Sequence, residues 1–164
     1  MRTRVRRCRA PAPVNVDLTY ILGSRVAVGG GIWTAADMAE LAGRGFTHVV
    51  NVQAEFDETE LGAAAGLAVL WNPTEDDLNE KPPEFFERAA QFALAALRDP
   101  GARLYVHCAA GVHRGPLAAA AIVCALGSEP EAAMELIASR REGVNFPPAY
   151  ALSLRRWAAS RPLA

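Results

Sequence analysis

The sequence predicts an α/β fold in which helices flank a central, mostly parallel β-sheet. Apolar, β-branched segments typical of buried strands alternate along the chain with segments whose apolar residues recur at helical spacing. The length of 164 residues and the hydrophobic content of 51% suit one hydrophobic core and leave little for a second. We therefore expect a single domain over residues 16–164, preceded by a flexible arm over residues 1–15 that contains several Arg and Pro residues.

The first part of the chain predicts a hairpin, a helix and a buried strand. These elements cover residues 18–22 and 25–28 (strands), 34–42 (helix) and 46–52 (strand). Gly23 and Ser24 are typical of the tight turn that joins two hairpin strands. Thr34 and Asp37 have the spacing of a capping box, which favours a helix start at this point. The next strand is nearly all apolar, as a strand covered on both faces requires.

The middle of the chain predicts two more strands and two helices. They cover residues 59–65 (helix), 68–71 (strand), 85–97 (helix) and 103–107 (strand), with a polar loop over 72–83. The aromatic and aliphatic residues of the longer helix recur on one face, so they are expected in the core and not in a ligand site. The turn sequence Asp99-Pro100-Gly101 ends this helix.

Three helices complete the chain, over residues 116–126, 128–140 and 149–160. Pro116 is expected at the first helical position, which has no need of a backbone N–H. Ser128 and Glu131 have capping-box spacing and predict the start of the next helix.

The loop between the strand over 103–107 and the following helix has a cysteine and an arginine at its two ends, Cys108 and Arg114. A loop that enters a helix N-terminus points backbone N–H groups at whatever it encloses, which favours an anion. The same N–H groups favour the thiolate of a cysteine beneath them, and an arginine side chain can hold two phosphoryl oxygens. The pattern predicts a phosphate-binding loop that contains its own nucleophile.

Residues 107–114, HCAAGVHR, match the HCxxGxxR signature of the cysteine-dependent protein phosphatases, and the chain resembles a compact, bacterial-type dual-specificity phosphatase. The resemblance implies a dual-specificity-phosphatase-like fold and hydrolysis of phosphomonoesters through a phosphocysteine intermediate. It implies that Cys108 attacks phosphorus, that Arg114 binds the phosphoryl oxygens and that His107 orients the loop. The phosphate-binding residues that it implies are Ala109, Ala110, Gly111, Val112, His113 and Arg114.

Such an enzyme also needs a general acid, because an alkoxide or phenoxide leaves poorly without a proton. In the resembling family this acid is an Asp between a strand and the long helix that follows it. The spacing Pro73-x-x-Asp76 favours Asp76, and Asp77 is the alternate residue. Glu75, or the absence of any acid, are further alternatives, since clustered carboxylates are usually just a solvated loop.

The residue after the signature arginine is usually Ser or Thr in the resembling family, and here it is Gly115. The missing hydroxyl predicts slower hydrolysis of the phosphocysteine, and Gly115→Ser is expected to speed it. A catalytically weak or inactive phosphate-binding module is therefore an alternative to an active enzyme.

The substrate is expected to be a phosphorylated protein with phosphotyrosine or phosphoserine/threonine, or alternatively a small non-protein phosphoester. The loop residues Ala109, Ala110 and Val112 are neutral, whereas a polyanionic lipid headgroup favours cations at these positions. Phosphate-like oxyanions are expected to inhibit. The chemistry needs no cofactor and no metal ion.

The composition limits the partners and the location. Five arginines lie in the first ten residues, so the rest of a chain with net charge −1 is acidic, and no nucleic-acid-binding surface is indicated. No apolar run is long enough to span a bilayer, and no membrane association is expected. The three cysteines, Cys8, Cys108 and Cys124, are widely spaced and odd in number, which favours a reducing cytoplasm.

Overall fold

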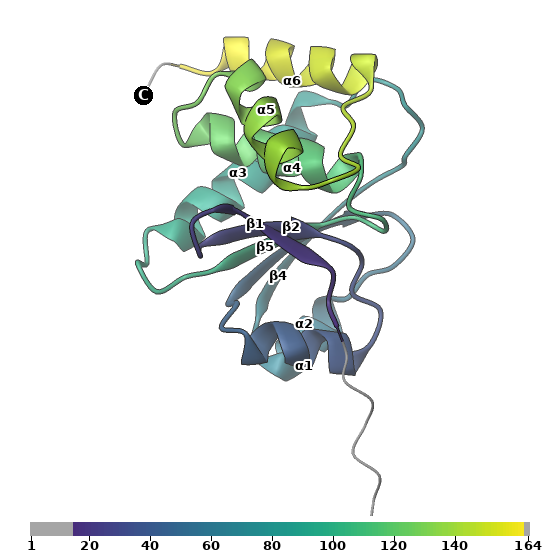
Figure 1. Cartoon of the computed structure of the whole chain (residues 1–164), viewed down its shortest axis with the longest axis vertical. Coiled ribbons are helices and arrows are strands. Elements are labelled where there is room, and N and C mark those ends of the chain that lie inside the picture. Colours follow the sequence, from purple (N-terminus) through teal and green to yellow (C-terminus); the bar gives the residue numbers. More distant parts are fainter. Residues whose placement is uncertain (1–14, 163–164) are drawn as a thin grey trace, which may run out of the picture.

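The computed structural model describes residues 15–162, and they form three layers in which one sheet separates two groups of helices (Figure 1). The predicted arm lies outside the described residues, apart from Asn15. The sheet has five strands in the order β1-β2-β5-β3-β4, and only the β1–β2 pair is antiparallel. The strands are β1 (Leu18–Leu22), β2 (Val26–Gly29), β3 (His48–Gln53), β4 (Ala68–Thr74) and β5 (Leu104–His107). The predicted α/β class with a mostly parallel sheet is confirmed.

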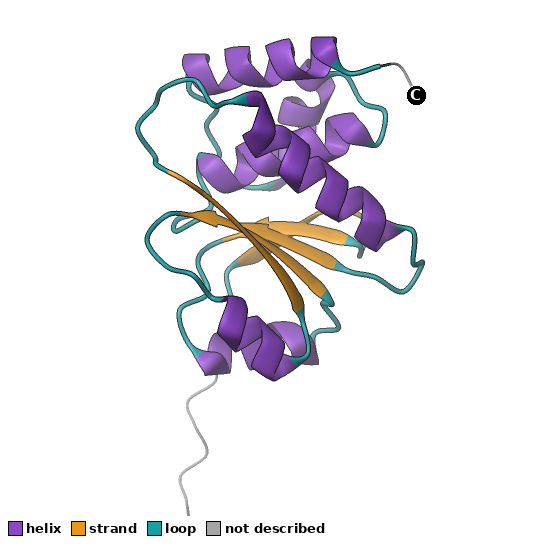
Figure 2. Cartoon of the chain, turned by 180° about the vertical axis from the view of Figure 1, so that it is seen from behind, coloured by secondary structure: helices purple, strands orange, loops and turns teal. Residues whose placement is uncertain are grey.

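The helices divide unevenly between the two faces of the sheet (Figure 2). Two short helices, α1 and α2, cover one face, and four helices cover the other. Their bounds are α1 (Ala35–Gly43), α2 (Thr59–Ala65), α3 (Pro83–Leu97), α4 (Arg114–Ala125), α5 (Pro130–Arg140) and α6 (Pro148–Ser160). None of the described helices is long and apolar enough to cross a membrane.

The larger hydrophobic core surrounds α4, which is buried from Arg114 to Val123 and contacts α3, α5, α6 and the sheet. Its alanines let these neighbours approach closely, so a helix without a polar face is stable at this central position. Strand β5 is also central, with β2 on one side and β3 on the other. The loop from β5 to α4 therefore begins at the central strand of the sheet and ends at the buried central helix.

Helix starts test the capping predictions. The capping box of Thr34 and Asp37 is confirmed, because each side chain accepts a hydrogen bond from the other residue's backbone N–H. The capping box of Ser128 and Glu131 is wrong. Helix α5 begins at Pro130 without a side-chain cap, and the Glu131 carboxylate pairs instead with Arg155 of α6. The fixed φ of a proline at the first position is sufficient to start this helix.

The start of α4 and the end of β4 differ from the predicted boundaries, and both lie close to the phosphate loop. Helix α4 begins at Arg114, so Pro116 is at the third helical position and not at the first. Strand β4 continues to Thr74 through three residues assigned to the polar loop, since pairing with β3 extends that far. The signature arginine thus belongs to the first turn of α4, and the strand carries the chain up to the two predicted acids.

Candidate active site

The loop from Cys108 to His113 turns its carbonyl groups outward. Every carbonyl oxygen in it accepts a hydrogen bond from a group outside the enclosed space. The donors, in chain order of the carbonyls, are His107 Nδ1, Gly31 N, Arg141 Nη2, Arg141 Nε, Asn145 N and Leu117 N. Among the described residues, no acceptor faces the N–H groups of Ala109, Ala110, Val112 or His113. The loop is therefore built to present backbone donors to an anion.

Cys108 lies beneath these donors. The residue is 2% exposed, and its Sγ accepts a hydrogen bond from the Gly111 N–H over 3.3 Å. Gly111 has φ +68°, and a side chain there would meet Gly29 O at 2.5 Å, so only glycine closes the loop over the sulfur. The sulfur therefore lies where the loop leads into the N-terminus of α4, a position that favours a bound anion.

Arg114 is buried and held by a carboxylate that the sequence analysis did not single out. Its Nη1 and Nη2 donate to the two oxygens of Glu55 over 2.9 and 2.8 Å, and Nη1 also donates to Thr74 O. Burial works to lower the pKa of Arg114, but the hydrogen bond to Glu55 and nearby negative charges outweigh it and raise that pKa. The guanidinium thus stays charged, and its buried Nε–H has no partner. That donor is available for a phosphoryl oxygen.

His107, at the start of the loop, contacts a second carboxylate that the sequence analysis did not single out. The His107 and Glu58 side chains are fully buried, with Nε2 and Oε1 2.6 Å apart. The other ring nitrogen faces Cys108 O over 3.2 Å. Glu55 and Glu58 both lie in the acidic run that the sequence indicated only as the end of a strand. Their spacing carries no recognisable motif.

A second buried arginine holds the loop from outside. Arg141 Nε donates to Gly111 O over 2.9 Å, and Arg141 is paired with Asp17, which precedes β1. The hydrogen bond from Arg141 lowers the pKa of Asp17, and burial opposes it only in part. Nothing in the local sequence distinguishes Arg141 from the arginine before it, so this role depends on the fold.

The two candidate acids face different ways. Asp76 Oδ1 accepts a hydrogen bond from the Tyr150 hydroxyl over 3.0 Å, and Oδ2 lies 3.1 Å from His113 Nδ1 in the phosphate loop. Asp77 instead binds Lys81 over 2.6 Å. That hydrogen bond lowers the pKa of Asp77 to about 2. The structure brings Asp76, and not Asp77, into contact with the signature loop.

Gly115 packs directly against the start of the loop. A side-chain Cβ there would lie 3.0 Å from Cys108 N and 3.1 Å from His107 C, and both are backbone atoms at the end of β5. The absence of Ser or Thr is therefore coupled to a close approach of α4 to the sheet. Adding a side chain requires these backbone atoms to shift, a constraint that no local sequence pattern reveals.

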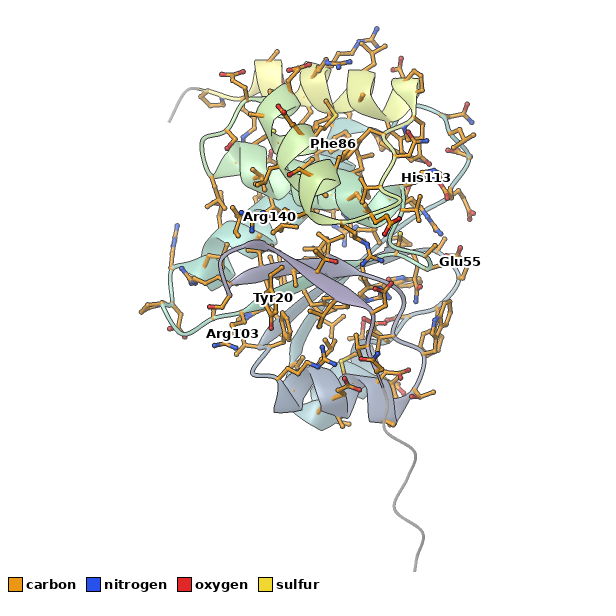
Figure 3. All side chains as sticks on the ribbon, in the orientation of Figure 1. Tyr20, Glu55, Phe86, Arg103, His113 and Arg140 are labelled. Atoms are coloured by element: carbon orange, nitrogen blue, oxygen red, sulfur yellow. The ribbon has the colours of Figure 1, made fainter. Side chains whose placement is uncertain are left out.

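The site residues lie together at the carboxyl end of the parallel strands. Figure 3 shows Glu55 and His113 on one side of the molecule, away from Arg103 and Tyr20. Cys124 is ten residues beyond Arg114 on the same helix, so about 15 Å of helix separates it from the phosphate loop. This distance excludes a disulfide between Cys108 and Cys124.

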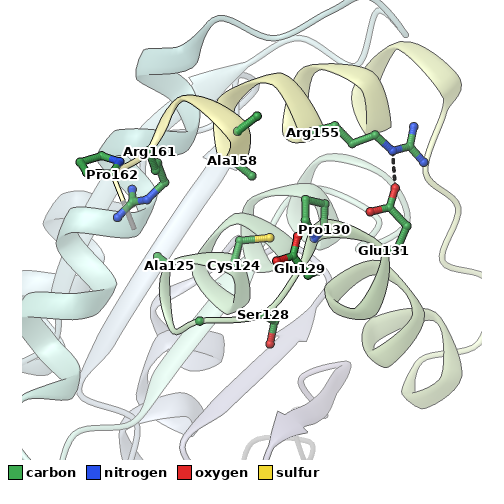
Figure 4. A pocket seen from close by; sticks show the side chains of 12 residues that line it. Cys124, Ala125, Ser128, Glu129, Pro130, Glu131, Arg155, Ala158, Arg161 and Pro162 are labelled. Carbon is green, nitrogen blue, oxygen red and sulfur yellow. Dashed lines mark hydrogen bonds and ion pairs between the residues drawn. The ribbon is translucent and has the colours of Figure 1, made fainter. Parts of the chain in front are cut away.

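Cys124 lines a pocket of about 670 Å³ at the far end of α4, between the α4–α5 turn and α6 (Figure 4). Burial raises the pKa of its thiol to about 11, so the thiol is protonated near neutral pH. The pocket is separate from the phosphate loop and shares none of its residues.

A cysteine beneath loop amides, a paired arginine and an aspartate in contact with the loop together form the arrangement of a cysteine-based phosphatase site. Residues 31–160 match the family model described as the dual specificity phosphatase catalytic domain. The chain belongs to this family and hydrolyses phosphoesters, as the signature predicted. No curated protein matches it in sequence.

Solved structures share the fold. PTPMT1 is 23% identical with a TM-score of 0.74, and the match covers 87% of this chain and 94% of that one. Tk-PTP in the active form is 19% identical with a TM-score of 0.76, covering 88% and 98%. Human DUSP28 is 24% identical with a TM-score of 0.71, covering 91% and 97%. PTPMT1 has also been solved in complex with PI(5)P, at 22% identity and a TM-score of 0.75 over 87% of this chain and 96% of that one.

Proposed function

We propose that Cys108 is the nucleophile of a two-step phosphomonoester hydrolysis, with Arg114 as the phosphate clamp, His107 as the residue that orients the loop and Asp76 as the general acid. In the first step an S–P bond forms at Cys108 while the P–O bond to the leaving group breaks and Asp76 protonates the leaving oxygen. In the second step water attacks phosphorus, the S–P bond breaks and Asp76 takes the proton from the water. The outward-facing carbonyls of the loop, which leave its N–H groups free, carry this proposal.

The test compares wild type with Cys108→Ser on an activated aryl phosphate. Hydrolysis is expected to disappear in the variant, while binding of tungstate or vanadate persists because the loop N–H groups and Arg114 remain. Cys124→Ser is the matched control, since this substitution removes a thiol outside the site. The variant is expected to hydrolyse the aryl phosphate at the wild-type rate. Turnover by Cys108→Ser would overturn the assignment of the nucleophile.

The proposed substrate is a phosphorylated protein, with phosphotyrosine and phosphoserine/threonine both accepted. Support comes from the neutral side chains of Ala109, Ala110 and Val112, which offer a polyanion no extra charge. It also comes from Trp33, which is 47% exposed and whose ring centroid lies 6.0 Å from that of Phe56, the neighbour of Glu55, with the two rings tilted by 32°. The Trp33 ring lies against Gly31, whose N–H binds the loop carbonyl of Ala109. An aromatic surface beside the loop suits the ring of a tyrosyl or aryl phosphate.

A small non-protein phosphoester is the second candidate, and the PI(5)P complex of PTPMT1 is the observation that favours it. Comparing kcat/KM for phosphotyrosyl and phosphoseryl peptides, PI(5)P and small alkyl phosphates separates the two. Higher kcat/KM on PI(5)P than on every peptide would reverse the assignment. The proposed location is the cytoplasm, because the chemistry needs a reduced thiol. We also propose that phosphate-like oxyanions inhibit the enzyme, because the loop donors suit any tetrahedral anion.

A further inference from the structure

His113 is an ionisable side chain inside the phosphate loop that contacts the proposed acid. Its Nδ1 lies 3.1 Å from Asp76 Oδ2, and the opposite carboxylate oxygen is held by the Tyr150 hydroxyl. Burial and the hydrogen bond to Asp76 raise the pKa of Tyr150 to about 12, so this hydroxyl is a permanent donor near neutral pH. Both oxygens of the acid are therefore engaged before a substrate binds.

We propose that His113 is a positioning residue that shares a proton with Asp76, so that the two side chains act as one acid with its working range nearer to neutral pH. The inference rests on the proposed role of Asp76. It assigns to His113 a function that the signature, in which this position is unspecified, does not imply.

The proposal depends on how many protons the His113 and Asp76 side chains hold between them. When Asp76 is ionised and the ring is neutral, the single ring proton lies between Nδ1 and Oδ2, and the pair has no proton to give. One further proton makes the pair competent, with the ring positively charged or the carboxyl neutral. An imidazole takes up a proton about 2 to 3 pH units nearer to neutrality than a carboxyl group does. The pair therefore keeps its transferable proton at a pH where an isolated carboxyl group has lost it.

The steps balance within the proposed mechanism. The competent pair gives one proton, from the Asp76 carboxyl, to the leaving oxygen as the P–O bond breaks and the S–P bond forms. It regains one proton from the attacking water as the S–P bond breaks. No other proton donor is needed, and the ring returns to its starting state after each turnover.

Other groups face the pair and contribute to its charge balance. Arg114 is close enough for Asp76 to help raise the pKa of its guanidinium. The pair is partly exposed, with 26% of the His113 side chain and 37% of the Asp76 side chain accessible, so solvent moderates every one of these effects. The titratable and charged groups nearby are Tyr150, which binds Asp76, Arg114 with its partner Glu55, and Asp77 with its partner Lys81.

His113→Asn tests the proposal, because an asparagine side chain keeps an N–H donor near the position of Nδ1 but does not titrate. On a tyrosyl or alkyl phosphate, the basic limb of its pH–kcat profile is expected to move about one pH unit or more toward acid, with kcat restored at about pH 5. His113→Ala, which removes the donor as well, is expected to lower kcat across the whole range. His48→Asn is the matched control, since His48 is a half-buried histidine of β3 that binds Thr47, and its profile should match wild type.

The outcomes separate the two proposals. A basic limb for His113→Asn that coincides with wild type would overturn the shared proton and leave Asp76 acting alone. A wild-type enzyme without a leaving-group-dependent basic limb would contradict the proposed acid itself, and the inference with it. A shift that is large for the tyrosyl phosphate and small for an activated aryl phosphate supports both, because only the poorer leaving group needs the proton.

Discussion

The carboxylate of Glu55 accepts two hydrogen bonds from Arg114, over 2.8 and 2.9 Å, so the arginine of the signature is paired with a negative charge before any phosphate arrives. This pairing fixes the plane of the guanidinium and leaves the buried Nε–H free. Glu55 itself is half exposed, so the pair is not sealed from water. Glu55 therefore sets the direction of the arginine side chain, and the loop N–H groups are expected to supply much of the anion binding.

Glu55→Gln is therefore expected to lower kcat by roughly 10- to 150-fold, since misaligning one charge-assisted contact in the transition state costs about 1.5–3 kcal/mol. Tungstate affinity is expected to stay level or to tighten, because a competing negative charge is removed. Steady-state kinetics and tungstate titration measure the two effects. An unchanged kcat would show that Arg114 keeps its direction without Glu55.

Asp76→Asn is expected to depress kcat by about 10²- to 10⁴-fold on a tyrosyl phosphate and much less on an activated aryl phosphate. Asp77 serves as the control. The hydrogen bond from Lys81 lowers the pKa of Asp77 to about 2, so this carboxyl is already ionised at any higher pH and has no proton to donate. Asp77→Asn should keep the wild-type basic limb. If Asp77→Asn showed the loss of kcat and Asp76→Asn kept the wild-type profile, Asp77 would be the general acid.

Gly115→Ser is expected to destabilise the protein by about 1–3 kcal/mol, because its Cβ would press on the backbone of Cys108 and His107. In a domain of this size that loss lowers Tm by roughly 2–4 °C per kcal/mol. The rise in turnover expected from the hydroxyl alone is therefore offset by displacement of the loop. Thermal unfolding and stopped-flow kinetics on Gly115→Ser and Gly115→Ala separate the two effects. A faster steady rate at unchanged Tm would mean that α4 moves aside freely.

Asp17→Asn tests the outer support of the loop. The Arg141 guanidinium holds the pKa of Asp17 below its ordinary value of 3.8, so the ionised form is bound more tightly in the folded state. This stabilisation is present above the pKa of the unfolded chain and disappears as pH falls through the lower folded value. At neutral pH we expect a loss of about 1 kcal/mol, since the Asp17 side chain is largely exposed. The Tm difference from wild type should vanish in strong acid, and a difference that persists there would contradict the ion pair as its cause.

Trp33→Ala is expected to raise KM for a tyrosyl or aryl phosphate by roughly 2- to 12-fold, the scale of about 0.5–1.5 kcal/mol for one aromatic contact. A small alkyl phosphate has no ring to lose, and its KM should not change. Leu126→Ala is the matched control, because Leu126 is equally exposed, at 47%, and lies at the far end of α4. An equal rise in KM for aryl and alkyl phosphates would show that Trp33 supports the loop and does not bind the substrate ring.

Local chemistry in the sequence determined the α/β class, the nucleophile loop and the order of most elements. Strand and helix periodicity is a property of neighbouring residues, and the segment from His107 to Arg114 holds its cysteine, glycine and arginine within one loop. The capping box at Thr34 is likewise local and was confirmed. The one at Ser128 was wrong, because a proline start and a tertiary ion pair of Glu131 replaced it.

Only the tertiary structure decided which distant side chains serve the loop. Glu55, Glu58 and Arg141 reach it across 59, 49 and 30 residues of sequence. The two glutamates follow β3, which ends at the same edge of the sheet as β5, whereas Arg141 is placed by the packing of α5 against β1. The different contacts of Asp76 and Asp77 also depend on the tertiary structure, since neighbouring side chains point in different directions and only Asp76 meets His113. A buried charged side chain needs a partner of opposite charge or a hydrogen-bond partner. Tertiary packing, and not the neighbouring residues in the sequence, determines which partner it has.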